Sequence, residues 1–355
     1  MQKTYKPLEN FTAEIIKGII SRLMKLAKPK KDGFNLDDAR DLVGNDWSEV
    51  NLLISNKLKS DVALVNSVSR YIVNSGGKRL RPLLVLLAAK ACGYKGDKHI
   101  LAATIIEFIH TATLLHDDVV DKSSLRRGQK TANEVFGNQA SVLVGDFLYS
   151  RAFQLMVEIG QLRIMDVLAN ATNSISEGEV IQLISCNDPE TTEREYMEII
   201  YRKTAKLFEA GMVIGAILAG QTRSTEDCMA EYGRQLGVAF QLVDDAFDYG
   251  SSTSNLGKNI GDDLTEGKPT LPLIHALERA SAKDQVIIRM SILEGGGDKI
   301  DEIAEIIKAT GSIAYTFKKA EAASIKAINS IKSLPESTFK DSLINLAQFA
   351  INREF

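Results

Sequence analysis

The sequence is poor in proline, cysteine and tryptophan, with 7, 3 and 1 of these among its 355 residues. So few prolines, together with long stretches that lack alternating β-branched residues, favour an all-helical protein. Cys92, Cys186 and Cys228 are scattered along the chain without paired spacing. This pattern argues against a zinc site and against a disulfide framework, and it is typical of a protein in a reducing compartment.

The chain also lacks a large excess of charge of one sign and a long apolar run. Its net charge of −3 argues against a general nucleic-acid-binding protein, so we expect no nucleic-acid partner. No uninterrupted apolar run reaches the roughly 18 residues that span a bilayer. Glu9 and Glu14 interrupt the region where a signal peptide would be apolar. We therefore expect a globular protein in the cytoplasm.

An acidic cluster follows an apolar helical stretch in the segment HTATLLHDDVVDKSSLRRG. It contains Asp117, Asp118 and Asp121. Positions i and i+4 share a helix face, so the first and last of these carboxylates project side by side. They repel each other unless a cation or a proton lies between them. Oxygen ligands suit Mg²⁺, which proteins usually hold with a few carboxylates and the phosphates of a substrate. Arg126 and Arg127, which follow, then predict an anion clamp.

A second acidic cluster has the same spacing and again follows an apolar helical run. Asp244, Asp245 and Asp248 lie in the segment AFQLVDDAFDYG. One short acidic motif is more often a solvated helix end than a metal site. Two copies, each at the foot of an apolar helix, instead indicate two facing helices with a metal–diphosphate cluster between them.

Basic residues near glycines predict anion sites at two further places. In SGGKRLRP, two glycines precede Lys78, Arg79 and Arg81, and a proline can open the next helix. A helix N-terminus with adjacent cations is an anion site, although this segment alone could equally be a solvated loop. In GKNIGDDLTEGKPTLPL, Lys258 and Lys268 flank two aspartates. Such glycine-rich loops of mixed charge are usually only solvated, but next to an acidic metal cluster this one predicts a lid that brings lysines to the phosphates.

The remaining helices are predicted from apolar periodicity. One amphipathic helix is expected over residues 47–73, and Thr192 is expected to cap a helix. Residues 1–45 are expected to form an N-terminal helical extension, either packed on the body or a partner subunit or lying on a membrane surface. Further helices are expected over residues 83–93, 99–116, 165–186 and 229–247, and after residue 278 with a break at the three glycines 295–297.

These motifs together resemble the trans-prenyl diphosphate synthases, or polyprenyl synthetases, and are most similar to those of the bacterial octaprenyl diphosphate synthases. The resemblance covers about residues 47–353. It rests on SGGKRLRP, IEFIHTATLLHDDVVD, RRG, FGNQASVLVGDFLYSRAF, RKTAKLFEA, AFQLVDDAFDY and GKNIGDDLTEGKPTLPL, in family order. It implies an all-α fold: one large helical bundle of the isoprenoid synthase type around a deep central cavity. Residues 46–355 would form the catalytic domain, usually in a homodimer.

The resemblance also implies a role for individual residues. Three Mg²⁺ ions per active site would be held by Asp117, Asp121 and Asp244, with Asp118, Asp245 and Asp248 beside them. Isopentenyl diphosphate would be bound by Lys78, Arg81, His110 and Arg127. The allylic diphosphate would be bound by Arg126, Lys203, Thr204, Gln241, Lys258 and Lys268.

The activity that the resemblance implies is Mg²⁺-dependent, head-to-tail addition of isopentenyl diphosphate to an allylic diphosphate such as farnesyl diphosphate. The product would be a long all-trans chain, octaprenyl diphosphate, for the side chain of an isoprenoid quinone. Product release would involve transient contact with the inner membrane. In the family an aromatic residue shortly before the first motif stops elongation early, whereas Ala112 and Thr113 are small. Phe108 and Met156 are expected deeper in the cavity, although Ala112 could also be a plain helix contact.

Three alternatives remain at this point. The first is a shorter-chain synthase that makes farnesyl or geranylgeranyl diphosphate. The second is a class I terpene cyclase, which usually has an Asn/Ser/Glu second motif and lacks SGGKRLRP. The third is a non-catalytic subunit of a heteromeric synthase, in which the aspartates are normally eroded; here both clusters are complete.

Overall fold

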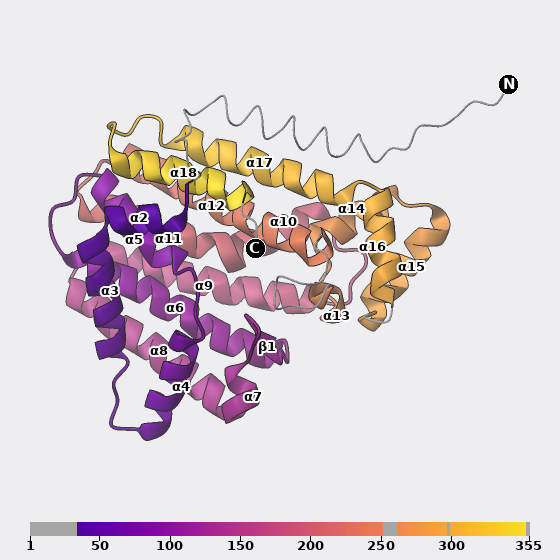
Figure 1. Ribbon diagram of the computed structural model, residues 1–355, viewed down its shortest axis with the longest axis horizontal. Helices are drawn as coiled ribbons and strands as arrows, with labels where there is room; N and C mark the ends of the chain where they lie inside the picture. Colours follow the sequence, from indigo (N-terminus) through magenta and orange to yellow (C-terminus); the bar gives the residue numbers. More distant parts are fainter. Residues whose placement is uncertain (1–33, 251–260, 297–298, 353–355) are drawn as a thin grey trace.

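The computed structural model describes residues 34–250, 261–296 and 299–352 (Figure 1). Most of the predicted N-terminal extension and Lys258 lie outside these residues. The elements in chain order are α2 (Leu36–Leu42), α3 (Gly44–Lys57), α4 (Ala63–Asn74), α5 (Leu80–Ala91), α6 (Lys98–Val120), β1 (Leu125–Arg126), β2 (Gln129–Lys130), α7 (Ala132–Phe136), α8 (Asn138–Ile159), α9 (Leu162–Ser185), α10 (Glu193–Ile200), η1 (Tyr201–Ala205), α11 (Lys206–Leu218), α12 (Arg223–Gly250), α13 (Asp262–Thr265), α14 (Leu271–Arg279), α15 (Ala282–Glu294), α16 (Ile300–Ala309), α17 (Ser312–Ser330) and α18 (Thr338–Asn352). The predicted all-α fold is confirmed, because the described strands are two residues each.

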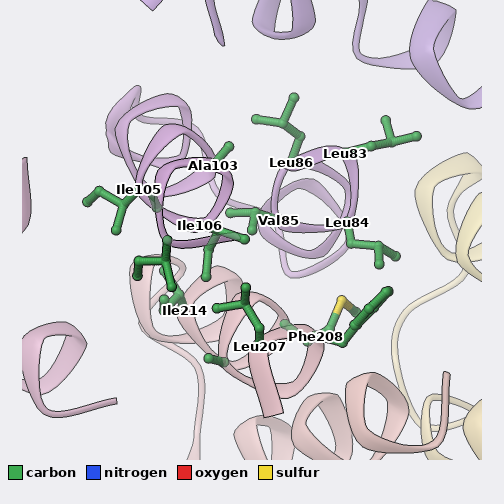
Figure 2. Close-up of a cluster of buried hydrophobic side chains, with 14 of the residues drawn as sticks. Leu83, Leu84, Val85, Leu86, Ala103, Ile105, Ile106, Leu207, Phe208 and Ile214 are labelled. Carbon is green, nitrogen blue, oxygen red and sulfur yellow. The ribbon is translucent and has the colours of Figure 1, made fainter. Parts of the chain in front are cut away.

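The core lies where α5, α6 and α11 pack side by side (Figure 2). Nearly all side chains of α5 are buried, as expected for a helix that is apolar all round. Val85 on α5, Ile106 on α6 and Leu207 on α11 meet at the centre of this cluster. Helices α8 and α12 pack on the outer sides of α6 and α11, and α17 covers α12. The two helices that carry the acidic motifs are therefore fixed by the largest hydrophobic core of the protein.

Helix α6 is long and apolar enough to cross a membrane by length and composition alone. Its most apolar stretch is 61% buried against neighbouring helices. It packs against α3, α5, α8 and α11 in the core described above. The composition of α6 is therefore accounted for by its central position in the bundle.

The single helix predicted over residues 47–73 is wrong, because the chain forms two helices there. Helix α3 ends at Lys57 and α4 begins at Ala63. Between them, the Asn66 side chain accepts from the Ser60 amide at 3.0 Å and donates to the Ser60 carbonyl at 2.6 Å. These local bonds satisfy backbone groups that a continuous helix would otherwise pair, which makes the break stable.

Two other local predictions are tested by the helix termini. Thr192 caps α10 as expected, in a capping box with Glu195. The helix predicted to follow is not uniform, because residues 201–205 form a π-helical turn between α10 and α11. The predicted break at the glycines begins at Gly295, the C-cap of α15 in the left-handed conformation.

Helix α2 lies within the predicted extension but packs on the body. Leu36, Ala39 and Val43 are buried in the main core, and α2 lies against α3 and α18. Asn35 caps this helix in a capping box with Asp38. The division of the chain at residue 45 stays a prediction.

Candidate active site

A cavity of about 1470 Å³ lies between α6 and α12, with the SGGKRLRP segment, β1, η1 and residues 262–270 around it. Both acidic motifs and both predicted anion sites contribute to its lining. The predicted site residues that line it are Lys78, Arg81, Phe108, His110, Thr113, Asp117, Asp121, Arg126, Arg127, Lys203, Thr204, Gln241, Asp244, Asp245, Asp248 and Lys268. The structure therefore brings these separate segments together around one cavity.

The carboxylates of the first motif face lysines across the cavity. Lys268 binds Asp121 at 2.8 Å and Glu266 at 2.6 Å. The Lys203 amine lies 3.9 Å from Asp117 and binds Glu179 at 2.6 Å. Burial, with Glu179 and Asp121 nearby, raises the pKa of Asp117 to about 6 in spite of Lys203. This end of the cavity is therefore a crowded acidic site that needs cationic partners.

Asp118 and Arg126 form a buried pair beside the first motif. The guanidinium donates from Nε at 2.8 Å and from Nη2 at 2.6 Å to one oxygen of Asp118, which is fully buried. Burial alone would lower the pKa of Arg126, but the bond to Asp118 and the charges of Asp117 and Asp121 raise it. Asp118 does not line the cavity; it holds Arg126, which does.

The second motif belongs to a chain of side-chain hydrogen bonds that links α10, η1 and α12. Thr204 donates to Gln241 at 2.9 Å, and Gln241 donates to Asp245 at 2.8 Å. The Tyr196 hydroxyl donates to the other oxygen of Asp245. Burial and the neighbouring Asp263 raise the pKa of Asp245 to about 8, despite these donors. The network fixes the start of the second motif to the turn that carries Lys203 and Thr204.

The basic end of the cavity is built around Arg81 and His110. Arg81 donates to Nε2 of His110 at 3.1 Å and lies over the Phe208 ring, 4.5 Å from its centre. Burial and the charges of Arg81, Arg127 and Arg126 hold the pKa of His110 well below its usual range, so the ring is neutral. Gly77 makes room for Arg127, because a Cβ there would lie 2.6 Å from the guanidinium. This end offers several fixed cations and a neutral imidazole to an anion.

Two glycines allow the π-helical turn to approach its neighbours. A Cβ on Gly178 of α9 would lie 2.8 Å from the Arg202 Cβ and 2.9 Å from the backbone nitrogen of Lys203. A Cβ on Gly237 of α12 would lie 2.5 Å from the Ala205 Cα. The turn is thus held between α9 and α12, at the depth that puts Lys203 beside Asp117. Single π turns inside helices often occur at functional sites.

In the described residues, no group of three His, Cys, Asp or Glu side chains is assembled closely enough to hold an ion by itself. Lys268 and Lys203 instead neutralise part of the negative charge of the first motif. The donor set still fits Mg²⁺, because the acidic groups are oxygen ligands and because burial, with Glu179 and Asp121 nearby, raises the pKa of Asp117, whose ionised form a cation would stabilise. Phosphate oxygens would have to complete the coordination, and the lysines would have to turn toward them.

Several cavity residues were not predicted as site residues. Glu107, Glu179, Tyr196 and Glu266 all line the cavity, and Glu179 and Glu266 hold the two lysines. Glu107 could have been found, because it is the single acidic residue in the apolar stretch ILAATIIEFIHTATLL. Tyr196 gives no such signal, since it occupies an ordinary apolar position of an amphipathic helix.

The residues predicted to set chain length fall into two groups. Phe108 and Thr113 line the cavity, and the apolar residues of its wall include Ile54, Leu58 and Leu148. Ala112 and Met156 are buried in the core, with 0% and 2% of their surface exposed, and lie outside the lining. Their role in chain length stays a prediction.

Comparison with known proteins identifies relatives over most of the chain. Residues 62–310 match the family model described as polyprenyl synthetase. The octaprenyl diphosphate synthase of Escherichia coli (strain K12) is 50% identical over 321 residues, which cover 90% of this chain and 99% of that protein. The all-trans-nonaprenyl-diphosphate synthase (geranyl-diphosphate specific) of Rhodobacter capsulatus is 45% identical, over 88% of this chain and 96% of that protein.

A solved structure matches the fold as well as the sequence. It is a polyprenyl synthase from Caulobacter crescentus CB15, complexed with calcium and isoprenyl diphosphate. Its TM-score to this chain is 0.87 at 42% sequence identity, covering 92% of this chain and 99% of that one.

Proposed function

The chain belongs to the polyprenyl synthetase family and is a trans-prenyltransferase, and from this premise we propose that it makes a long all-trans polyprenyl diphosphate, octaprenyl diphosphate, from farnesyl and isopentenyl diphosphates. The observation that carries the proposal is the cavity that joins both acidic motifs to the basic SGGKRLRP segment. Such a cavity can hold two diphosphates with their hydrocarbon parts in contact. The proposed use of the product is the side chain of an isoprenoid quinone.

We propose that the allylic diphosphate lies at the acidic end. Mg²⁺ bound by Asp117, Asp121 and Asp244, three ions in all, would neutralise the leaving diphosphate. Lys203, Lys268 and Arg126 would turn from their carboxylate partners to the phosphate oxygens, where they stabilise charge that grows as the C–O bond breaks. Thr204 and Gln241 would bind at the same end, and Lys258 is assigned there by resemblance alone.

Isopentenyl diphosphate would lie at the basic end, held by Lys78, Arg81, His110 and Arg127. The neutral ring of His110 keeps one nitrogen available as an acceptor for Arg81, so the guanidinium is oriented before substrate arrives. The double bond of isopentenyl diphosphate attacks the allylic carbon, and the apolar part of the wall excludes water from the cation. No side-chain base is required if the released diphosphate takes the proton.

Product sizing tests this function. Purified protein is incubated with radiolabelled isopentenyl diphosphate, farnesyl diphosphate and Mg²⁺, and the product is dephosphorylated and sized by chromatography. A long polyprenol that disappears on chelation supports the proposal. A farnesyl or geranylgeranyl product would support the shorter-chain alternative, and a cyclic hydrocarbon would support a cyclase.

We expect Thr113→Tyr and Ala112→Tyr to shorten the product to about the geranylgeranyl range. Thr113 lines the cavity one helical turn from Asp117, a rise of about 6 Å. Ala112 is closely packed, so a tyrosine there would be forced out of the helix contact and toward the cavity. Thr113→Val, which keeps the shape of the side chain, is the control. Unchanged product length in both tyrosine variants, with normal folding, would refute this assignment of the cavity.

We propose that the enzyme is a homodimer and touches the membrane only to release product. Helices α8 and α9 expose large apolar side chains on one face each: Val142, Leu143, Phe153, Val157, Leu162, Val180, Leu183 and Ile184. An exposed apolar surface of this kind usually marks an interface. In sedimentation we expect the mass of a dimer for the protein alone, and association with phospholipid vesicles only after product has accumulated. A monomer, or constant vesicle binding, would contradict these proposals.

A further inference from the structure

The basic end of the cavity contains one buried carboxylate, Glu107. It lines the cavity on α6, one helical turn before His110. One of its oxygens, Oε2, is buried and has no hydrogen-bond partner in the described part of the chain; the same is true of the Arg81 Nε. Burial raises the pKa of Glu107, while the charges of Arg79, Arg81 and Arg127 oppose that rise. Glu107 therefore lies within the electrostatic influence of three guanidinium groups, yet its Oε2 makes no hydrogen bond in the described part of the chain.

A carboxylate is negatively charged, so it repels an anion that binds nearby. Four cationic side chains line this end of the cavity: Lys78, Arg79, Arg81 and Arg127. His110 adds no charge, since its ring is neutral. In its ionised form Glu107 weakens the positive potential that a diphosphate meets here, and its buried location makes the effect larger than at a surface. If tight binding were the only requirement, this position would be better filled by a neutral residue.

Repeated elongation gives a reason to limit how tightly the basic end binds diphosphate. Isopentenyl diphosphate attacks with its terminal carbon and keeps its own diphosphate, so each new product begins with its diphosphate at the basic end. The next addition needs that group at the acidic end, beside Asp117 and Asp244. A basic end that binds too tightly lowers the KM for isopentenyl diphosphate but slows this transfer, and it does not raise kcat.

We propose that Glu107 is a specificity-determining residue that weakens the hold of the basic end on diphosphate, so that the product can leave it after every addition. The inference rests on the proposed function, because a synthase that stops after one addition needs no such transfer. It explains why a charged residue interrupts the apolar surface of α6. It also explains why Glu107 lines the same cavity as the arginines while its Oε2 has no hydrogen-bond partner in the described structure.

Glu107→Gln tests the inference, because it removes the charge and keeps the shape. We expect the KM for isopentenyl diphosphate to fall about tenfold, as loss of one repelling charge at this range implies. We also expect the first addition, in a single turnover, to keep its rate within about twofold. Later additions should slow, so products should shorten at equal substrate. Glu107→Asp, which keeps the charge, should restore both KM and product length.

A double variant separates this role from a purely structural one. If Glu107 only holds the arginines in place, Arg79→Gln added to Glu107→Gln should worsen the defect. If it sets the charge, the double variant restores the balance and should return KM and product length toward those of the wild type. The double variant also covers the case in which Glu107→Gln alone does not fold. Glu226→Gln is the matched control, since Glu226 is a buried carboxylate paired with Arg163 and Arg223, far along α12 from the motif.

The outcomes are distinguishable. A wild-type enzyme that adds only one unit, or none, would overturn the proposed function and this inference with it. A wild-type enzyme that elongates normally, with folded Glu107→Gln showing an unchanged or raised KM and an unchanged product, would overturn the inference alone. The same holds if the charge-balanced double variant is more impaired than Glu107→Gln.

Discussion

Asp117→Asn is expected to lower kcat about 1000-fold or more, because a neutral amide cannot help to hold the cations that neutralise the leaving diphosphate. Asp117 lines the cavity, and Lys203 and Asp121 are its charged neighbours. The substitution keeps the size of the side chain, so the cavity should keep its shape. Steady-state rates at saturating Mg²⁺ and both substrates measure the effect. Binding of isopentenyl diphosphate at the basic end should change little.

The same variant is expected to be more stable than the wild type when Mg²⁺ is absent. Burial, Glu179 and Asp121 raise the pKa of Asp117 from 3.8 to about 6. Between these values the folded protein binds the proton more tightly than the unfolded chain does, so the free energy of unfolding falls as pH rises through this window. At pH 7 the ionised carboxylate costs on the order of 3 kcal/mol. Thermal melts at pH 7 with chelator should therefore give a higher Tm for Asp117→Asn.

A matched control is available on the helix that carries the second motif. Asp227 is an exposed residue near the start of α12, and Asp227→Asn should leave both kcat and Tm unchanged. Residual activity of Asp117→Asn above about a tenth of the wild type, measured at saturating Mg²⁺, would remove Asp117 from the proposed metal site. A lower Tm without Mg²⁺ would show that its ionised form is stabilised by its neighbours.

The meeting of the two acidic motifs could be predicted because it depends on helical periodicity. Asp117 and Asp244 each follow an apolar run that must be buried. The run before Asp117 is buried in the main core, and the run before Asp244 is buried mostly in a second cluster on the same helix bundle, so that both runs end at the cavity. The cluster of cations before Pro82 could be placed nearby for the same reason, because α5 is apolar on all sides. The arrangement of these helices therefore follows from the positions of the apolar residues along the sequence.

The pairing within the site could not be predicted, because it depends on which side chains a fold brings within 4 Å. Lys268 was expected at a phosphate, but here it binds Asp121 and Glu266. Arg126 was also expected at a phosphate, and it binds Asp118 with two hydrogen bonds. In both cases the cation is next to the predicted site and is bound by a carboxylate of this chain.

The π-helical turn could not be predicted either, because its cause lies in other helices. The sequence YRKTAKLF reads as an ordinary amphipathic segment. What distinguishes it is the pair Gly178 and Gly237 on α9 and α12, which let both helices approach the backbone of the turn. Those glycines look like unremarkable interruptions of their own helices, since a mid-helix glycine costs only about 1 kcal/mol. Only the packing shows that a side chain at either position would clash with the turn.

Gly237→Ala is accordingly expected to lower kcat at least about tenfold and to reduce the free energy of unfolding by about 2 kcal/mol. The added Cβ would lie 2.5 Å from the Ala205 Cα and 2.9 Å from its Cβ, so the turn has to move. That displacement carries Thr204 away from Gln241, one helical turn beyond the substitution, and Lys203 away from Asp117. Denaturant unfolding and steady-state kinetics measure the two effects. The KM for the allylic substrate should rise more than that for isopentenyl diphosphate.

Gly44→Ala is the matched control, because a Cβ at Gly44 meets no atom within 4 Å. Gly44 is the first residue of α3. We expect its unfolding free energy to stay within about 0.5 kcal/mol of the wild type, with unchanged kinetics. Alanine raises helix propensity at both positions, so any difference between the two variants comes from the contact with Ala205. If Gly237→Ala is as active and as stable as Gly44→Ala, the position of the π-helical turn does not control the placement of Lys203.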